Sequence, residues 1–353
     1  MKKIRLLIVA DSAVFRGIIE RGVSSDPDIE TVAIATDPYE ARDKIIEFAP
    51  DVMVCDVVMP KMNGIEFIRR LLPQYPIRVI VMSSVSDVVL DAMNAGAVDF
   101  VAKPDVSIGR TKDVFLQDLI SKIKVAASAN INIGSHTDSA RDSIPDSTRN
   151  QAPATVLNQN KTPSYSKKII AIGASTGGTE AIYSILSKLP TDLPGIVIVQ
   201  HIPPVFSRMF AERMNNSTMF SVREAKTGDY VESGLVLVAP GDMHMRIKRL
   251  GSKLRVETFA GEKVNGHCPS ADVLFESVAK ACGEDAVGVI LTGMGDDGAR
   301  GLLSMRQAGA RTIGQDEKTS VVYGMPKVAY EIGAVEKQYS LQNIPGAIIT
   351  ASQ

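Results

Sequence analysis

The sequence predicts two α/β domains, each built on a mainly parallel sheet and joined by a polar segment. Both halves of the chain alternate short apolar runs with stretches in which apolar residues recur at helical spacing. This alternation is typical of βα units, which form parallel sheets with helices on both faces. The apolar runs lie at 4–9, 31–35, 52–55, 78–82 and 98–102 in the first half, and at 168–172, 196–200, 287–291 and 310–314 in the second.

The first half, residues 1–125, is therefore expected to hold five βα units. The second half, residues 167–353, is expected to be a doubly wound domain of similar style. Its middle section is different, because residues 230–239 and 243–259 indicate strands that are connected by turns.

Residues 126–166 differ from both halves in composition. Of these 41 residues, 18 are Ser, Thr, Asn or Gln, and the bulky apolar residues are isolated. Such a segment cannot bury enough apolar surface to offset the entropy that it would lose on ordering. We therefore expect a flexible linker at 126–166; a long surface loop within one domain is the alternative.

The composition argues against several classes of protein. Lys and Arg total 39 and Asp and Glu total 40, so a formal net charge of −1 provides no positive field for nucleic acid. No apolar run approaches the roughly 20 residues that cross a bilayer, and the start of the chain resembles a strand more than a secretion signal. Cys55, Cys268 and Cys282 are too dispersed for a disulfide framework or a metal cluster. We expect a cytoplasmic monomer that neither inserts into a membrane nor binds nucleic acid.

Four polar residues of the first half come just after expected strands. Asp11 follows the first strand, Asp56 the third, Ser83 the fourth and Lys103 the fifth. The carboxyl ends of parallel strands meet at one edge of a sheet, where ligands bind. Two carboxylates suit Mg²⁺, the lysine and hydroxyl can bind a phosphoryl group, and an aspartate can accept one covalently. Any one of these residues could simply solvate its loop, but four at one edge favour a phosphoacceptor site.

In the second half, the run at 168–172 leads into residues 173–177, GASTG, and then into a helix. This matches G-x-S-x-G, a strand–turn–helix motif that exposes a nucleophilic serine, here Ser175. The N-terminus of the helix favours negative charge on an oxyanion, and the geometry of the motif makes the Thr176 N–H the first candidate donor. A dinucleotide site and a Walker A loop do not fit, because G-x-G-x-x-G spacing and a following lysine are both absent. A glycine turn without chemistry remains open.

A nucleophilic serine needs a base, and the chain has four histidines. His201 directly follows the second apolar run of this half, so it should reach the same edge of the sheet as Ser175. His136 lies in the expected linker. His244 and His267 lie in the middle section, away from a clear parallel strand end, and remain competitors for the role of base.

The base in turn needs an acid that orients its ring. Asp296 and Asp297 both lie just beyond the apolar run at 287–291, so position alone does not choose between them. Capping of a helix N-terminus is the alternative role for either. The order along the chain is Ser, His, Asp, whereas α/β-hydrolases have Ser, Asp, His, so the serine motif belongs to a different fold.

Residues 1–125 resemble the receiver domains of response regulators, which have a flavodoxin-like (βα)5 fold. The matching segments are VADS, DVVMPKMNG, the serine pair at 83–84 and GAVDFVAKP. The resemblance implies that Asp56 is the phosphoacceptor and that Asp11 and Asp56 bind Mg²⁺. It also implies that a chemotaxis histidine kinase donates the phosphoryl group.

The same resemblance assigns a conformational switch to Ser83 and Phe100, beside Lys103. In receivers the Lys–Pro step, here at 103–104, is often cis. One departure is Ala10, because receivers usually carry a second acid at this position. We therefore expect weakened Mg²⁺ affinity rather than loss of phosphorylation.

Residues 167–353 resemble the catalytic domain of chemotaxis protein-glutamate methylesterases of the CheB type. The matching segments are IGASTGG, VQHIPP, APGDMH, PSADVLF, ILTGMGDDGA and VYGMPK. The resemblance implies a catalytic triad of Ser175, His201 and Asp297. Asp297 is chosen because the family motif G-M-G-x-D-G leaves Asp296 at the variable position.

The family pattern also places Met294 at the lining of the site. Cys268 departs from it, since many relatives carry arginine before the following proline. A substrate contact at Cys268 is therefore in doubt, although the chemistry is not.

Together, the resemblances imply a phosphorylation-regulated hydrolase that acts on chemoreceptors. It would cleave glutamate γ-methyl esters, releasing methanol, and deamidate glutamines by the same route. The esterase chemistry would need no cofactor, whereas receiver phosphorylation would need Mg²⁺, and the unphosphorylated receiver would cover the catalytic site. A receiver joined to a binding module without chemistry stays open. The 20 basic and 19 acidic residues from 167 onward argue against a DNA-binding module. A small-molecule serine hydrolase is the third possibility.

Overall fold

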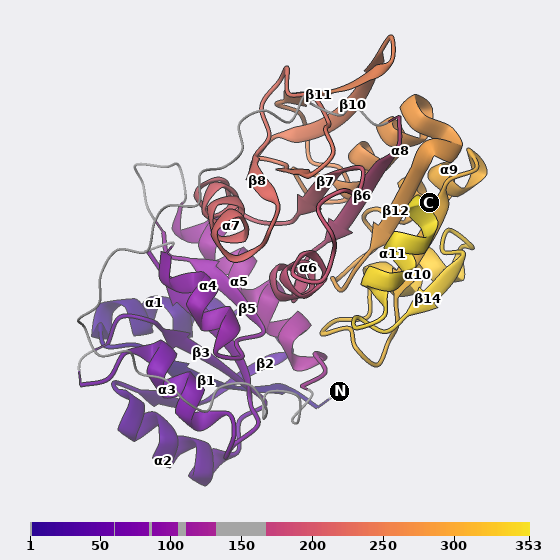
Figure 1. Ribbon diagram of the computed structural model, residues 1–353. Coiled ribbons are helices and arrows are strands. Elements are labelled where there is room, and N and C mark those ends of the chain that lie inside the picture. Colours follow the sequence, from indigo (N-terminus) through magenta and orange to yellow (C-terminus); the bar gives the residue numbers. More distant parts are fainter. Residues whose placement is uncertain (1, 60, 85–86, 105–110, 132–166) are drawn as a thin grey trace, which may run out of the picture.

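A computed structural model describes residues 2–59, 61–84, 87–104, 111–131 and 167–353 (Figure 1). Two α/β domains are present, the first drawn in indigo to magenta and the second in magenta to yellow. Most of the expected linker, residues 132–166, lies outside the described residues.

Five parallel strands form the sheet of the first domain, in the order β2-β1-β3-β4-β5. Alternate residues of β1 enter two cores, Leu7 and Val9 on one face and Leu6 and Ile8 on the other. Helices therefore cover both faces, and the expected (βα)5 fold is confirmed. The strands are β1 (Ile4–Val9), β2 (Ile29–Ala35), β3 (Val52–Asp56), β4 (Arg78–Ser83) and β5 (Asp99–Ala102). The helices are α1 (Ala13–Val23), α2 (Pro38–Phe48), α3 (Gly64–Leu71), α4 (Asp87–Asn94) and α5 (Lys112–Ala127).

Polar side chains set where these helices begin. Ser12 caps α1 by accepting a hydrogen bond from Phe15 N–H at 3.3 Å, and Asn63 caps α3 by accepting from Ile65 N–H at 2.8 Å. Such caps satisfy backbone donors that have no partner inside the helix. Because Ser12 directly follows Asp11, the cap of α1 also fixes that acid at the carboxyl edge of the sheet.

A seven-stranded parallel sheet forms the second domain, in the order β14-β13-β12-β6-β7-β9-β8. The strands are β6 (Ile169–Ala174), β7 (Gly195–Gln200), β8 (Ser221–Glu224), β9 (Leu235–Val238), β12 (Ala286–Ile290), β13 (Arg311–Gln315) and β14 (Lys337–Tyr339). The helices are α6 (Gly178–Leu186), α7 (Pro204–Ser217), α8 (Ala271–Cys282), α9 (Ala299–Gln307), α10 (Met325–Glu331) and α11 (Ile344–Ser352), with a short 3₁₀ helix, η2 (Gly283–Asp285), after α8.

The order of this sheet reverses at β6. The chain passes from β6 to β7 on one side and returns later to β12 on the other side. In open parallel sheets, ligands bind beyond the carboxyl ends of the strands at such a point. The topology therefore places a site at the ends of β6, β7 and β12.

The middle section forms both β9 and an antiparallel hairpin, β10 (His244–Leu250) and β11 (Lys253–Phe259), which projects from the domain (Figure 1). The sequence does not predict the two edge strands, β8 and β14. Both are short and partly exposed, with polar residues such as Arg223 and Lys337, so they lack the buried apolar run that marks a central strand.

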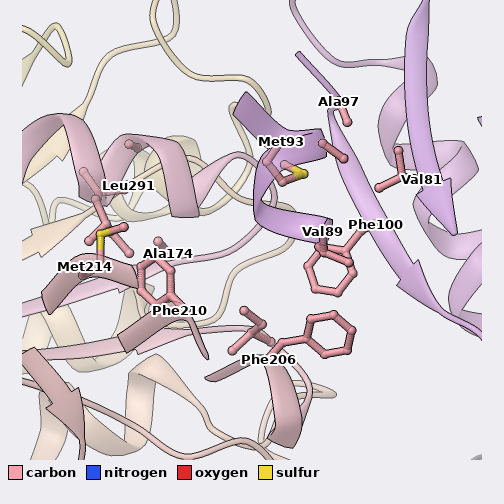
Figure 2. Packing of buried hydrophobic residues seen from close by; sticks show 14 of the residues in the cluster. Val81, Val89, Met93, Ala97, Phe100, Ala174, Phe206, Phe210, Met214 and Leu291 are labelled. Atoms are coloured by element: carbon pink, nitrogen blue, oxygen red, sulfur yellow. The ribbon is translucent and has the colours of Figure 1, made fainter. Parts of the chain in front are cut away.

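The two domains share a hydrophobic core (Figure 2). Phe100 of β5 packs on Phe206 of α7, with ring centroids 4.7 Å apart. Beside this apolar contact, Arg213 Nη1 of α7 lies 3.7 Å from Asp91 Oδ1 of α4. The first domain thus contacts the second through α4 and β5.

The first residues of the expected linker are packed in the structure. Helix α5 continues to Ala127, Ala126 and Ala129 are buried, and Asn130 N–H donates to the Val321 carbonyl of the second domain at 2.9 Å. Composition does not reveal this packing, because small alanines bury little apolar surface and alternate with polar residues. The residues up to Asn130 therefore pack against the folded domains.

Candidate active site

Ser175 lies in a tight turn between β6 and α6. It is the first residue after β6, and Gly178 N–H donates to its carbonyl at 2.7 Å. Gly177 has a φ of 77°, which glycine adopts without strain. A Cβ at Gly177 would also lie 2.7 Å from the Val321 side chain. The turn that presents the serine therefore requires glycine at this position.

His201 is the first residue after β7, which pairs with β6. Ala174 pairs with Gln200 at the end of the two strands, and His201 N–H donates to the Ala174 carbonyl at 3.1 Å. Ser175 and His201 therefore leave the sheet from adjacent strands at the same edge.

One nitrogen of the His201 ring is held and the other is free. Nε2 lies 2.8 Å from Asp297 Oδ2, so its proton is donated to the carboxylate. Nδ1 is buried and has no hydrogen-bond partner among the described residues. With the proton on Nε2, Nδ1 carries the lone pair that a general base needs.

Asp297 lies in the loop between β12 and α9 and is fully buried. Burial by itself would raise its pKa, but the hydrogen bonds from His201, Ser270 and Ala271 outweigh burial and hold the pKa of Asp297 below its usual range. The carboxylate is thus ionised beside the imidazole. Its donors are His201, Asn265, Ser270 and the backbone N–H groups of Ala271 and Asp272 at the start of α8.

A second histidine, His267, stacks on His201. The ring centroids are 3.7 Å apart and the rings are 10° from parallel. Burial, followed by the nearby His201, lowers the pKa of His267 to about 4, so this ring is neutral at neutral pH. The ligand atoms of His201, His267 and Asp297 lie within 4.8 Å of one another. In stacked rings the in-plane lone pairs point in parallel and do not converge on one point. The three residues therefore fit a histidine packed against a second ring better than they fit a metal site.

In the first domain, Asp56 ends β3 and is 1% exposed. Lys103 Nζ forms an ion pair with Asp56 Oδ2 and also lies 5.1 Å from the ring centroid of Phe15. Burial raises the pKa of Asp56; the hydrogen bond from Lys103 opposes this rise, and the charge of Asp11 adds to it. Two acids and an ammonium group thus act on one another at the carboxyl edge of the sheet.

These two acids fit the needs of Mg²⁺, which binds through one or two carboxylates and keeps several waters. Asp11 is exposed to solvent, and its charge disfavours ionisation of Asp56, an effect that a divalent cation would reverse. Ala10 is buried in the core and offers no ligand atom.

The residues of the expected switch lie on the next two strands. Ser83 ends β4 and is buried, while Phe100 of β5 is buried between the domains. The Lys103–Pro104 bond is not cis; in the described part of the chain the cis peptide bond joins Cys268 to Pro269.

Known proteins match the chain over its whole length. The CheB methylesterase family matches residues 170–348, and the response regulator receiver domain family matches residues 6–108. Over 348 residues the chain is 53% identical to protein-glutamate methylesterase/protein-glutamine glutaminase 2 of Syntrophomonas wolfei, covering 99% of this chain and 97% of that protein. The chain belongs to the CheB methylesterase family.

Two further relatives of this CheB chain agree. The protein-glutamate methylesterase/protein-glutamine glutaminase of Syntrophotalea carbinolica is 48% identical over 352 residues, covering 99% of this chain and 97% of the relative. The crystal structure of the Thermotoga maritima CheB methylesterase catalytic domain is 36% identical, with a TM-score of 0.51, and covers 52% of this chain and 98% of its own.

The remaining site residues named from the sequence differ in their exposure to solvent. Of the two neighbouring acids, Asp297 is buried against His201, whereas Asp296 is exposed. Thr176 is buried, and within the described residues its N–H donates no hydrogen bond. Met294, in the loop after β12, is 47% exposed.

Sequence reasoning about this CheB chain did not find Asn265 and Ser270, which hold Asp297. Ser270 is the N-cap of α8, and a serine before a helical apolar pattern is a recognisable signal. Asn265 lies in a loop with a φ of 51°, and no sequence spacing indicates its contact with Asp297.

None of the described helices combines the length and hydropathy needed to span a membrane.

Proposed function

We propose that this chain hydrolyses glutamate γ-methyl esters on chemoreceptors and deamidates receptor glutamines, with Ser175, His201 and Asp297 as the catalytic triad. One observation carries the proposal. His201 Nε2 donates a hydrogen bond to Asp297, and His201 Nδ1 has no partner among the described residues. His201 follows the strand that is adjacent to the one that presents Ser175. A ring nitrogen held by a carboxylate, with the second ring nitrogen left as an acceptor, is what nucleophilic catalysis by a serine needs of its histidine.

In the first half-reaction, Ser175 Oγ attacks the ester carbonyl carbon while His201 Nδ1 accepts the hydroxyl proton. The resulting imidazolium is stabilised by the ionised carboxylate of Asp297. The tetrahedral intermediate then collapses, and methanol leaves with the proton that His201 returns. For a glutamine substrate, the leaving group is ammonia.

In the second half-reaction, water attacks the acyl-enzyme. His201 Nδ1 removes a proton from the water and returns it to Ser175 Oγ, which frees the serine and a glutamate carboxylate. No atom of a metal or cofactor takes part in this route, because each proton moves between the substrate, Ser175, His201 and water.

The oxyanion needs donors that are in place before the reaction. The Thr176 N–H is the first candidate, since it follows the nucleophile in the turn and has no acceptor among the described residues. The N-terminus of α6 adds favourable partial charge at the same place. Met294 would line the entrance, consistent with its exposure.

The receiver domain would regulate this chemistry. Asp56 would accept a phosphoryl group from a chemotaxis histidine kinase, with Asp11 and Asp56 holding Mg²⁺, which neutralises phosphoryl charge when bound. Lys103 and Ser83 would close on the phosphoryl group, and Phe100 would follow Ser83 inward. Because Phe100 packs on Phe206 of the catalytic domain, this motion would loosen the domain contact.

The same proposal includes a monomer that works in the cytoplasm on the cytoplasmic part of receptors. Its partners are then the receptors as substrate and the kinase as phosphodonor, with no nucleic acid. The domain boundaries are proposed at 1–125 for the receiver and 167–353 for the catalytic domain, with the linker between them at 126–166, although Asn130 bonds the second domain.

The test measures the release of labelled methanol from membranes whose receptors carry labelled glutamate methyl esters. The full-length chain should release labelled methanol, and Ser175→Ala should lower turnover by a factor on the order of 10⁶, the size seen for loss of a triad serine. Substituting His201 as well should add little. Cleavage of small esters without any release from receptors would overturn the substrate, and activity retained by Ser175→Ala would overturn the triad.

A further inference from the structure

The side chain of Gln200 bridges the two catalytic residues. Its Nε2 donates to the Ser175 carbonyl at 2.8 Å and to the His201 carbonyl at 3.3 Å. Gln200 is 4% exposed, so these bonds lie out of reach of solvent. An amide nitrogen carries two hydrogens, and here each one faces a carbonyl of a different catalytic residue.

This contact is made just beyond the last residue pair of the two strands, where the backbone N–H groups of Ser175 and His201 still bond to neighbouring strand ends but their carbonyls have left the ladder. Ala174 and Gln200 form the last pair of the β6–β7 ladder, and beyond it the two strands turn apart. Ser175 continues into α6, and His201 continues toward α7. The Gln200 amide therefore replaces the ladder for one more residue on each strand and ties the nucleophile to the base through their backbones.

The oxygen of the Gln200 amide lowers the stability of the fold, and good packing does not explain why it is there. Gln200 Oε1 is buried and has no hydrogen-bond partner among the described residues. It lies against Gly178, where an added Cβ would be 2.2 Å away. A buried oxygen without a partner destabilises a fold, so an apolar side chain of similar size would fill this space at lower cost. The two hydrogen bonds from Nε2 are therefore the contribution that only the glutamine makes at this position.

We propose that Gln200 is a positioning residue that fixes the distance between Ser175 and His201. It does not touch the reacting atoms and acts only through the two carbonyls. The inference rests on the proposed function, since it concerns the transfer of a proton from Ser175 to His201. Its loss should lower kcat, which depends on the alignment of nucleophile and base, and should leave KM for the receptor nearly unchanged.

The first measurement is kcat and KM of full-length Gln200→Leu for methanol release from methyl-labelled receptor membranes. Misplacement of catalytic groups by about 1 Å costs on the order of 100-fold in rate, so a fall of this order in kcat is expected. The control is Thr312→Val. Thr312 is also buried in a strand of the same sheet, near the amino end of β13 and away from the carboxyl edge that holds Ser175, and its hydroxyl accepts from Glu336 N–H. The control should lose comparable thermal stability but far less kcat.

The second variant, Gln200→Glu, gives a readout that a packing role would not move. A protonated carboxyl can donate one hydrogen bond to either carbonyl, whereas an ionised carboxylate can donate none and repels both. The ratio of the variant rate to the wild-type rate should therefore rise as pH falls through the titration of the new acid. For Gln200→Leu, the same ratio should stay constant with pH.

Three outcomes decide between the possibilities. Wild-type kcat in Gln200→Leu, with Ser175→Ala inactive, overturns the positioning role and leaves the proposed function intact. Equal losses of kcat in Gln200→Leu and Thr312→Val also overturn it, because the effect then follows from stability alone. Full activity of Ser175→Ala overturns the proposed function itself.

Discussion

The Thr176 hydroxyl donates a hydrogen bond to Asp99 Oδ2 across the domain boundary, at 2.6 Å and out of contact with solvent. Thr176 follows Ser175, the proposed nucleophile, and Asp99 precedes Phe100, the proposed switch residue of the receiver. Asp99 is held in turn by Lys122 Nζ at 2.8 Å. One buried bond therefore joins the turn that presents Ser175 to the strand that is expected to move on phosphorylation.

The first prediction concerns this bond. Thr176→Val keeps the backbone N–H and the shape of the side chain but removes the donor to Asp99. A hydrogen bond to a charged group is worth about 1.5–3 kcal/mol, so the unphosphorylated rate should rise about tenfold or more as the closed arrangement weakens. The phosphodonor-activated rate should change little. Rates are measured on methyl-labelled receptor membranes.

The control for this variant is Thr312→Val. Thr312 is a buried threonine of the same domain whose hydroxyl accepts from Glu336 N–H, far from the receiver. It should destabilise the fold without raising the unphosphorylated rate. An unchanged basal rate in Thr176→Val would show that this bond does not hold the receiver against the catalytic domain.

The second prediction separates the two neighbouring aspartates. Asp297→Asn removes the charge that stabilises the His201 imidazolium and should cost up to about 10⁴-fold in kcat. Asp296→Asn should cost little, because Asp296 is exposed while Asp297 holds the imidazole. Steady-state hydrolysis by the two variants decides the matter, and the opposite ranking would show that the family motif is assigned one residue out of register.

The third prediction is a pH dependence of stability. The pKa of His267 falls from 6.5 to about 4 in the folded chain, so the unfolded chain takes up this proton first as pH falls. The stability that this group contributes is therefore complete above about pH 6.5 and is lost progressively toward about pH 4. The loss is on the order of 2 kcal/mol, since one pKa unit corresponds to about 1.4 kcal/mol and the ring keeps some contact with solvent.

His267→Phe keeps a flat ring on His201 and removes the titration. Thermal unfolding between these two pH values should show a shallower fall in Tm for the variant than for the wild type. Parallel curves for the two proteins would mean that other groups carry the acid sensitivity.

The fourth prediction concerns the phosphoacceptor site. A small phosphodonor with Mg²⁺ should raise the rate of the full-length chain, and Asp56→Asn should abolish the rise. Ala10→Asp should lower the Mg²⁺ concentration needed for half-maximal activation, because it adds a carboxylate beside Asp11. In the absence of Mg²⁺ the same variant should unfold at lower temperature, since position 10 is fully buried and a carboxylate there is desolvated. An unchanged Mg²⁺ requirement would show that Ala10 is not the reason for any weak metal binding.

The sequence predicts those parts of the site that follow from strand ends. Ser175 and His201 directly follow buried apolar runs of one sheet, and Asp56 ends such a run in the other sheet. In each parallel sheet, the ends of the strands meet at one edge. The central strands are predicted for the same reason, since they are long and continuously apolar. The edge strands β8 and β14 are not, because their pairing depends on neighbours that the local pattern does not contain.

The supporting contacts follow from long-range packing instead. His267 and Asn265 reach the triad from a loop whose path depends on the fit of α8 against the sheet. Position along the chain gives no sign of the stacking of His267 on His201. Likewise, Asn130 contacts the second domain from a segment whose composition indicates a linker. Each of these residues is placed by contacts that form only in the assembled fold.

The strand order β12-β6-β7 has a consequence for the newly made chain. Ser175 and His201 emerge from the ribosome close together, but Asp297 follows His201 by 96 residues and enters the site only when β12 inserts beside β6. A nascent or truncated chain that ends before β12 can pair its first two strands and still has a histidine without its carboxylate. We therefore expect full esterase activity only after β12 has joined the sheet.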